Sequence, residues 1–439
     1  MLETAALMLC LLASVLQPNS RSLFYPWKVM VAWTEEEGGM SIRWSTDLPV
    51  LGAKVRYRED CFGGQPGEWR HKRSKWEMKQ KSAWMIWECV HTVVLRDLSP
   101  LCAYEYQVGS GFMWSPLSRI SGRTPFLQSH PDTQPARLLV LGDLGLSPYS
   151  QLTKAAIRSY LSSHSVDAVL HTGDIAYGLD DHGGKVGDEY LDSLEGIANL
   201  YPYMVIPGNH EAPDNFTHYK WRFRMPVTEA NQATNFFYSF NLGRGHFIAL
   251  NTEIWAYDCS EAAQTQANWL LADLEKAANR RSEVPWLLAF GHKPLYCSVD
   301  WTRPLHEYKC NVNCWAETAA MRRRLEPVFE QFGLDVYIAS HVHRYERMSP
   351  IQRNTTVPSG KDSTHSHVNA RAPLYILSGT GGNNHGPDDV ATTPQLWSRF
   401  QTAESGFGVL TIFNKTHLLW EQYESATKTR VDYVWVIKS

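Results

Sequence analysis

The sequence has little excess charge of either sign. Its 439 residues include 42 Lys and Arg and 45 Asp and Glu, which gives a formal net charge of −3. Proteins that bind nucleic acids or acidic membrane surfaces usually carry a basic patch or a marked charge excess. The composition therefore indicates neither kind of partner, and nothing in the sequence assigns an oligomeric state.

Long apolar runs are also scarce. Ala5–Leu16 is an apolar run of 12 residues, and no later run reaches 18. Such a run is too short to cross a bilayer but has the length of a signal-peptide core. We therefore expect a signal peptide over residues 1–22, a secreted or lumenal protein, and no membrane span. The alternative is a buried N-terminal helix, because Glu3 and no Lys or Arg precedes the run.

Cysteine is scarce for a chain of this length, with eight in all. Because Cys10 falls in the expected signal peptide, seven remain, and one of these stays unpaired or pairs with another chain. Cys297, Cys310 and Cys314 lie close together in a loop-like stretch, where we expect structural disulfides; a zinc site is the alternative. Three sequons agree with secretion and predict N-glycans at Asn215, Asn354 and Asn414.

The region over residues 24–125 has the pattern of short β-strands. Polar and apolar residues alternate around Trp44, which we expect in the core of the module. Further on, a Leu-x-Pro turn at Leu98 is followed by Tyr-x-Tyr from Tyr104, which resembles the tyrosine corner of fibronectin type III sandwiches. We expect an all-β, fibronectin type III-like domain without catalytic groups, or a generic β-sandwich as the alternative. A polar linker follows Thr124.

From residue 136 to residue 439 the pattern changes to apolar runs without alternation. Such runs indicate strands that are covered on both faces. Helical patterns lie between several of them, over residues 151–164, 266–280 and 316–333. We expect an α/β domain, a layered β-sandwich flanked by helices. The runs are LLVLGD, AVLHTGD, MVIPGNH, WLLAFGH, VYIASH and LYILSGTGG.

Polar side chains follow five of these runs. The carboxyl ends of strands in an α/β sheet are where ligands bind, so we expect these side chains to meet at one edge. Two carboxylates, one phenol, one amide and three imidazoles are too many donors for one cation. They suit two ions that share a carboxylate, as in two-metal phosphoryl-transfer sites. The residues are Asp143, Asp174, Tyr177, Asn209, His292, His341 and His343.

Two similar patterns lie elsewhere and are not expected to bind metal. Gly187-Asp188 opens a helix-like segment and does not end a strand. His365 and His367 have the same spacing as His341 and His343, but they lie in a polar, loop-like run. Spacing alone is therefore a weak signal, and the preceding strand is what distinguishes the metal candidates.

The order GDLG, GDIAY, GNHE, GH and HVH resembles the metallophosphoesterases, and specifically the purple acid phosphatases. The segments FGHKPLYCS, HRYER and VDYVWVI extend this resemblance over nearly the whole chain. The resemblance implies Fe(III) bound by Asp143, Asp174, Tyr177 and His343. It implies Zn(II), Fe(II) or Mn(II) bound by Asp174, Asn209, His292 and His341, with Asp174 as the bridge.

Two positions depart from the wider superfamily. Gly145 stands where that superfamily commonly has a histidine ligand, and Tyr177 can replace it. A phenolate is a hard anionic donor and favours Fe(III); ordinary packing of Tyr177 beside the site is the alternative. Ser340 stands where a glycine is usual, and its β-carbon is tolerated if φ stays negative.

The resemblance implies a secreted acid phosphatase that hydrolyses small phosphate monoesters by attack of a metal-bound hydroxide. His210 would protonate the leaving alcohol and hold the phosphate; its alternative role is to orient a metal ligand. Plant-type enzymes carry further substrate histidines where this chain has Trp301 and Thr302, and His306 is a candidate substitute. Two other functions compete: a phosphodiesterase or nucleotide pyrophosphatase, which would more often carry His at position 145, and a non-enzymatic secreted glycoprotein.

Overall fold

A computed structural model describes residues 22–36, 38–61, 65–81, 87–125, 134–232, 234–256, 260–298, 314–391 and 394–439. The expected signal peptide lies almost wholly outside these residues, as do most of the expected linker, Trp301, Thr302 and His306. The chain forms two compact units. The N-terminal unit comprises Met1–Thr124 and Gly178–Tyr203, and the C-terminal unit comprises Pro125–Tyr177 and Met204–Ser439.

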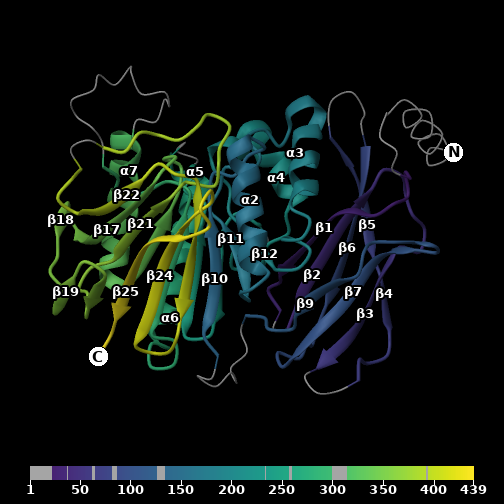
Figure 1. The fold of residues 1–439 in the computed structure, drawn as a ribbon, viewed down its shortest axis with the longest axis horizontal. Helices are drawn as coiled ribbons and strands as arrows, with labels where there is room; N and C mark the ends of the chain where they lie inside the picture. The colour runs from purple at the N-terminus through teal and green to yellow at the C-terminus, as the bar shows by residue number, and fades with distance from the viewer. Residues whose placement is uncertain are drawn as a thin grey trace. The chain divides into compact units, whose positions relative to one another are not determined.

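The N-terminal unit contains two antiparallel sheets, drawn in purple and blue in Figure 1. One sheet has the order β1-β2-β6-β5; the other has the order β4-β3-β7-β8, with β9 paired to β7. Trp44 on β2 is only 1% exposed, as predicted for a core residue. The all-β character predicted for residues 24–125 is confirmed, since the helix of this unit comes from the later segment Gly178–Tyr203. The strands are β1 (Trp27–Trp33), β2 (Met40–Thr46), β3 (Lys54–Cys61), β4 (Arg70–Arg73), β5 (Lys75–Gln80), β6 (Trp87–Leu95), β7 (Cys102–Ser110), β8 (Met113–Trp114) and β9 (Ser118–Ser121).

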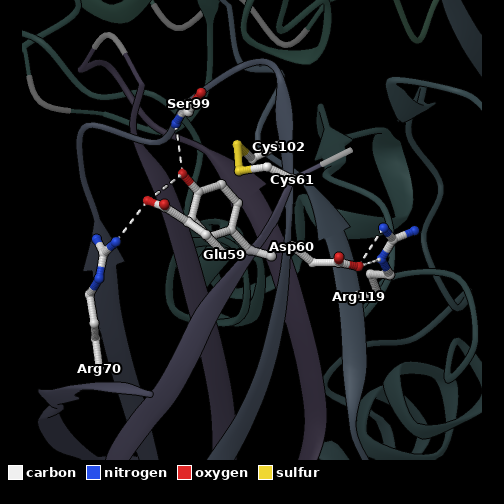
Figure 2. The surroundings of a disulfide bond; sticks show 8 residues. Glu59, Asp60, Cys61, Arg70, Ser99, Cys102 and Arg119 are labelled. Carbon is white, nitrogen blue, oxygen red and sulfur yellow. Dashed lines mark hydrogen bonds and ion pairs between the residues drawn. A yellow bond between two sulfur atoms is a disulfide. The ribbon is translucent and has the colours of Figure 1, made fainter. Parts of the chain in front are cut away.

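A disulfide and a tyrosine corner fix the ends of β3 and β7. Cys61 is bonded to Cys102, and the two lie opposite each other in the antiparallel pair (Figure 2). The Ser99 backbone N–H donates to the Tyr104 hydroxyl at 2.7 Å, and that hydroxyl donates to Glu59 at 3.3 Å. The predicted tyrosine corner is therefore present.

The segment Gly178–Tyr203 belongs to the N-terminal unit. A buried charge cluster holds it there, together with a backbone hydrogen bond of 2.8 Å from the Val31 N–H to the Ala198 carbonyl. Its helix α3 (Asp181–Ser193) contributes Asp188, whose Oδ1 lies 2.7 Å from Lys28 Nζ. Lys28 also contacts Glu88 at 2.5 Å, and Lys81 bridges the same two carboxylates. Two buried cations thus neutralise two buried anions. Asp188 is therefore engaged in structural ion pairs.

The C-terminal unit contains two larger sheets. The first has the order β12-β11-β10-β23-β24-β25-β20-β19 (Figure 1). In this sheet β10, from the beginning of the unit, pairs with β23, from near its end. β10 and β11 run parallel. The bounds are β10 (Ala136–Leu141), β11 (Ala168–His171), β12 (Tyr203–Val205), β19 (Lys361–Ser363), β20 (Ser366–Val368), β23 (Gly406–Ile412), β24 (His417–Glu424) and β25 (Arg430–Ile437).

The second sheet has the order β13-β14-β15-β16-β21-β17-β18, with β22 paired to β17. Its central strands β14, β15, β16 and β21 run parallel. The bounds are β13 (Tyr238–Leu242), β14 (Gly245–Leu250), β15 (Trp286–Gly291), β16 (Val336–Ala339), β17 (Tyr345–Gln352), β18 (Thr355–Thr356), β21 (Leu374–Ser378) and β22 (Ser398–Thr402). All six predicted apolar runs thus form strands. Five of these strands, β11, β12, β15, β16 and β21, are buried at every residue.

Helices cover these sheets, as predicted for an α/β domain. Helix α2 begins where Ser147 accepts a hydrogen bond from the Ser150 N–H and Pro148 occupies the first turn. Helices α6 and α7 contribute Leu274 and Phe329 to the buried core beside β15 and β16. The bounds are α2 (Pro148–Leu161), η1 (Asn209–Glu211), α4 (Pro213–Arg222), α5 (Glu253–Ala256), α6 (Ser260–Ala278) and α7 (Cys314–Phe332). Among the described residues, no helix combines the length and apolar character that a membrane span requires.

Candidate metal centre

Five strand ends meet at one place, and they come from both sheets of the C-terminal unit. Asp143 follows β10, Asp174 follows β11, and Asn209 opens η1 after β12. From the other sheet, His292 follows β15, and the segment carrying His341 and His343 follows β16. The sequence predicts one shared edge; the structure forms that edge from two sheets.

The backbone at this edge is strained. Asp143, Asp174, Tyr177 and His341 all have positive φ, between 54° and 75°. Such conformations cost on the order of 1–3 kcal/mol for residues other than glycine, and they persist only where the surrounding structure enforces them. The strain therefore coincides with the side chains that the sequence selects as ligands.

The first donor group consists of Asp174, His292 and His341, whose ligand atoms lie within 4.8 Å of one another. The Nε2 atom of His292 lies 3.2 Å from Asp174 Oδ2, 3.1 Å from Asn209 Oδ1 and 3.1 Å from His341 Nδ1. His292 Nδ1 donates to the Thr172 carbonyl at 2.9 Å, so Nε2 is the nitrogen left to bind a cation.

Positive charge is favoured at this point. Although burial acts to lower it, the neighbouring Asp174 carboxylate raises the pKa of His292 to about 10. Burial acts to raise the pKa of Asp174, yet His292 holds it well below its usual value. A metal cation between these atoms would take the place of the proton, so the donor set fits a metal ion.

The second donor group consists of Asp143, Asp174 and His343, again within 4.8 Å of one another. The Tyr177 hydroxyl donates to Asp143 Oδ1 at 3.1 Å and lies 2.9 Å from His343 Nε2. Asp174 thus belongs to both groups, whereas His341 and His343 belong to one group each. This is the arrangement that a bridging carboxylate between two ions requires.

The Tyr177 ring fills the space beside Gly145. A β-carbon at Gly145 would lie 2.3 Å from Asn384 Oδ1 and 3.3 Å from Tyr177 Cδ2. A histidine at this position would therefore collide with the side chains that are present. Gly145 and the Tyr177 ring therefore occupy neighbouring space, and a histidine at position 145 would collide with that ring. This is the relation expected if Tyr177 replaces a histidine ligand at position 145.

Three family models match the chain. They are described as purple acid phosphatase N-terminal domain over residues 26–121, calcineurin-like phosphoesterase over residues 136–345, and iron/zinc purple acid phosphatase-like protein C over residues 372–433. Acid phosphatase type 7 of Homo sapiens is 32% identical over 423 residues, which are 94% of this chain and 91% of the relative. The chain belongs to the purple acid phosphatase family.

Other members of the purple acid phosphatase family agree. Acid phosphatase type 7 of Danio rerio is 33% identical over 339 residues, covering 76% of this chain and 74% of the relative. The solved structure of the purple acid phosphatase PPD1 from yellow lupin has a TM-score of 0.76 at 20% identity. It covers 94% of this chain and 75% of the lupin chain, which shows the same fold.

In this purple acid phosphatase, Glu211 holds two of the metal motifs together. Its buried carboxylate accepts hydrogen bonds from the N–H groups of Asp174 at 3.0 Å, Ile175 at 2.8 Å and Gly208 at 2.8 Å. Burial, together with the charge of Asp174, raises its pKa to about 8. The sequence contains this residue in GNHE but gives no sign of its role, because two of its partners, Asp174 and Ile175, follow a different strand.

Ser340 has a similar structural role that sequence reasoning missed. Its hydroxyl donates to the Thr172 carbonyl at 2.5 Å and accepts from the Thr172 hydroxyl at 3.0 Å. The same carbonyl accepts the His292 Nδ1–H, so Ser340 supports the residue that orients this imidazole. Ser340 does not have a positive φ, which satisfies the condition set from the sequence for tolerating its β-carbon.

Burial raises the pKa values of two side chains of the second donor group, the Asp143 carboxyl and the Tyr177 phenol. Burial raises the pKa of Asp143 to about 7, with His292 partly opposing the shift. Burial and the adjacent Asp143 raise the pKa of Tyr177 well above its ordinary value. The phenol therefore keeps its proton unless a strongly charged cation replaces it.

The remaining predicted residues lie around or away from this centre. His210 is about one-third exposed, with Nε2 4.0 Å from Asp174 Oδ2. His367 pairs with Asp362 at 2.7 Å, and His365 stacks on Tyr433. Cys297 is disulfide-bonded, which agrees with the expected structural disulfide, and Cys310 is outside the described residues. Of the sequon residues, Asn215 and Asn354 are exposed and Asn414 is partly buried.

Proposed function

We propose that this purple acid phosphatase is a secreted, dinuclear metal-dependent enzyme that hydrolyses phosphate monoesters at acidic pH. The observation that carries the proposal is the sharing of Asp174 by two donor groups of three residues each. One shared carboxylate between two groups supports a pair of ions at the short separation used for phosphoryl transfer.

The proposed ligand sets follow these two groups. Asp143, Asp174, Tyr177 and His343 would hold Fe(III), because two carboxylates and a phenolate are hard, anionic donors. Asp174, Asn209, His292 and His341 would hold Zn(II), Fe(II) or Mn(II). When bound, such a pair of ions would activate water as a nucleophile and stabilise the charge that develops on the phosphate oxygens.

His210 is the proposed proton donor to the leaving alcohol and a contact for the phosphate group. Its backbone N–H donates to Asp174 Oδ1 at 3.0 Å, which fixes the main chain, while its imidazole is partly exposed. A partly exposed imidazole beside buried ligands can contact a substrate that approaches from solvent. Imidazole is also the side chain that most often serves as a general acid or base in enzymes.

Secretion is supported by the chemistry of the N-terminal unit. The Cys61–Cys102 disulfide is of a kind that persists in oxidising compartments. We further propose N-glycans at Asn215, Asn354 and Asn414. Endoglycosidase treatment of protein secreted from animal cells should reduce its mass, and Asn→Gln variants should remove the shifts one at a time.

Metal analysis combined with a comparison of two substrates tests the enzymatic proposal. Purified protein should contain iron, absorb visible light through a phenolate-to-iron band, and hydrolyse p-nitrophenyl phosphate faster than bis(p-nitrophenyl) phosphate at acidic pH. Tyr177→Phe should abolish the band, because the phenolate is its source, and His343→Ala should bleach the protein by loss of iron. Colourless, metal-free and inert wild-type protein would contradict the proposal, and a strong preference for the diester would indicate a phosphodiesterase.

A further inference from the structure

A further aromatic ring, that of His385, lies at the candidate metal centre, and neither donor group uses it. The ring of His385 lies 5.5 Å from the ring of Tyr177, 5.7 Å from that of His210 and 6.3 Å from that of His343. His385 comes from the loop between β21 and β22, whereas the other three follow other strands. Four rings from four separate segments thus form one cluster.

The loop that carries His385 is held on both sides. On the side before His385, Asn383 Oδ1 accepts the His385 N–H at 2.6 Å, and Asn384 Oδ1 accepts the Leu146 N–H at 3.2 Å. After it, Asp388 Oδ2 accepts the His343 N–H at 2.8 Å, and the Asp388 N–H donates to the His343 carbonyl at 3.0 Å. The loop is therefore attached to both the first and the last metal motif.

Exposure divides the cluster into two layers. Tyr177 and His343 are buried, at 7% and 5% exposure, whereas His210 is partly exposed and His385 is exposed. A side chain that serves only to pack the site would be covered by its neighbours. The two outer imidazoles are instead open to any molecule that reaches the buried donors from solvent.

We propose that His385 is a substrate-contacting residue that donates a hydrogen bond to the phosphate group, together with His210. An imidazole N–H reaches an oxygen at about 3 Å, so two rings 5.7 Å apart can both donate to one phosphate group. Neutral imidazole has the required N–H, so the role does not depend on protonation. The inference deepens the proposed phosphatase function and rests on it.

Two variants of His385 test this role in the metal-loaded protein. His385→Ala removes the donor, whereas His385→Gln retains an N–H group at similar reach. We expect His385→Ala to raise both KM for p-nitrophenyl phosphate and Ki for inorganic phosphate by about tenfold or more, as for a lost hydrogen bond to a charged group. His385→Gln should recover much of this loss. Metal content and the visible band should stay unchanged in both.

The control is His365→Ala, which removes a partly exposed histidine of the same unit that stacks on Tyr433 away from the cluster. It should leave KM and Ki unchanged. Unchanged KM and Ki in His385→Ala would overturn the inference, and so would a loss of metal, which would show a structural role. Calorimetric titration with inorganic phosphate separates the proposed phosphatase activity from the proposed role of His385. It measures how His385→Ala changes the affinity for phosphate even if the wild-type protein has no monoesterase activity.

Discussion

At the scale of single residues, Ser340 shows how a non-glycine residue is accommodated in the HVH motif. Gly142 leaves the space for it: a β-carbon at Gly142 would lie 2.4 Å from Ser340 Cβ and 2.5 Å from Thr172 Oγ1. The serine and this glycine therefore form a matched pair. Substitutions at the two positions should have very different effects.

Ser340→Gly should keep the metals. The Thr172 carbonyl still accepts the His292 Nδ1–H, and the backbone bond from position 340 to the His292 carbonyl, 3.0 Å long, does not need a side chain. Loss of the hydroxyl contacts should cost about 1 kcal/mol of unfolding free energy. Metal analysis and urea unfolding measure both effects. Gly142→Ala is the contrasting variant and should lose metal; equal metal loss in the two would contradict this reading.

Because of the buried His91, we expect the N-terminal unit to lose folding stability at acidic pH. It is buried between Thr46 and Ser74, stacks on Trp44, and burial lowers its pKa to about 4. Because the folded pKa lies below the unfolded value, the neutral form stabilises the fold fully above about pH 6.5. On the order of 3 kcal/mol should be lost as the pH falls towards 4.

Hydrogen exchange of the β2 and β6 amides between pH 7 and pH 4 measures this loss in the full chain, after correction for intrinsic exchange rates. His91→Gln cannot take up the proton, so its pH dependence should be flatter than that of the wild type. Identical slopes for the two proteins would show that His91 does not titrate as described.

The seven ligand candidates could be proposed from the sequence because each lies within six residues of the end of a strand that the apolar runs predict. Residues with a supporting role could not be identified in this way. Glu211 binds the backbone after β11, and Ser340 binds Thr172, which belongs to the other sheet. Their significance depends on which strand ends meet, and local patterns do not contain that information.

At the scale of secondary-structure elements, β17 and β25 are joined by a buried ion pair. Arg347 Nε and Nη2 contact the two carboxylate oxygens of Asp432 at 2.7 and 2.9 Å, and the Tyr345 hydroxyl donates to the same carboxylate at 2.8 Å. The HRYER and VDYVWVI segments therefore contact each other across the two sheets, although they lie far apart in the sequence.

Asp432→Asn should destabilise the C-terminal unit by about 3 kcal/mol or more, because it leaves the Arg347 charge buried without its counterion. Thermal and urea unfolding measure the change. The matched control is Glu421→Gln, which removes the partner of the half-exposed Arg430 on neighbouring strands and should cost less than about 1 kcal/mol. Similar losses for both variants would show that burial does not determine the effect.

The existence of the main elements could be predicted, but their pairing could not. Apolar runs predicted β10, β11, β15, β16 and β21, since strands covered on both faces need continuous apolar sequence. The division into two sheets depends on pairings such as β10 with β23, which join distant segments. The segment 178–203 shows the same difficulty, because it is held in the N-terminal unit by contacts with distant residues such as Lys28, Val31 and Lys81.

At the scale of the whole molecule, metal binding should stabilise the C-terminal unit. A ligand that binds only the folded state adds about 4 kcal/mol to the free energy of unfolding when its concentration is a thousand times its Kd. Chelation should therefore lower the melting temperature by several degrees, and Fe and Zn should restore it. Amide exchange in β2 and β6 should not change, because those strands belong to the other unit. An unchanged melting temperature after complete metal removal would contradict the prediction.

The course of the chain between the two units affects how the protein responds to proteolysis. The chain passes from one unit to the other after Thr124, after Tyr177 and after Tyr203. A single cut at a protease site introduced between residues 125 and 134 therefore leaves the two units joined at Tyr177–Gly178 and at Tyr203–Met204. The fragment that ends at the cut is then held non-covalently, by its packing with residues 178–203. Cleaved protein should give two bands on a denaturing gel but migrate as one species under native conditions. Two separate native species would contradict this course of the chain.

The same course of the chain has an evolutionary consequence. The N-terminal unit cannot be exchanged as one contiguous segment, because the residue that follows the candidate ligand Tyr177 already belongs to it.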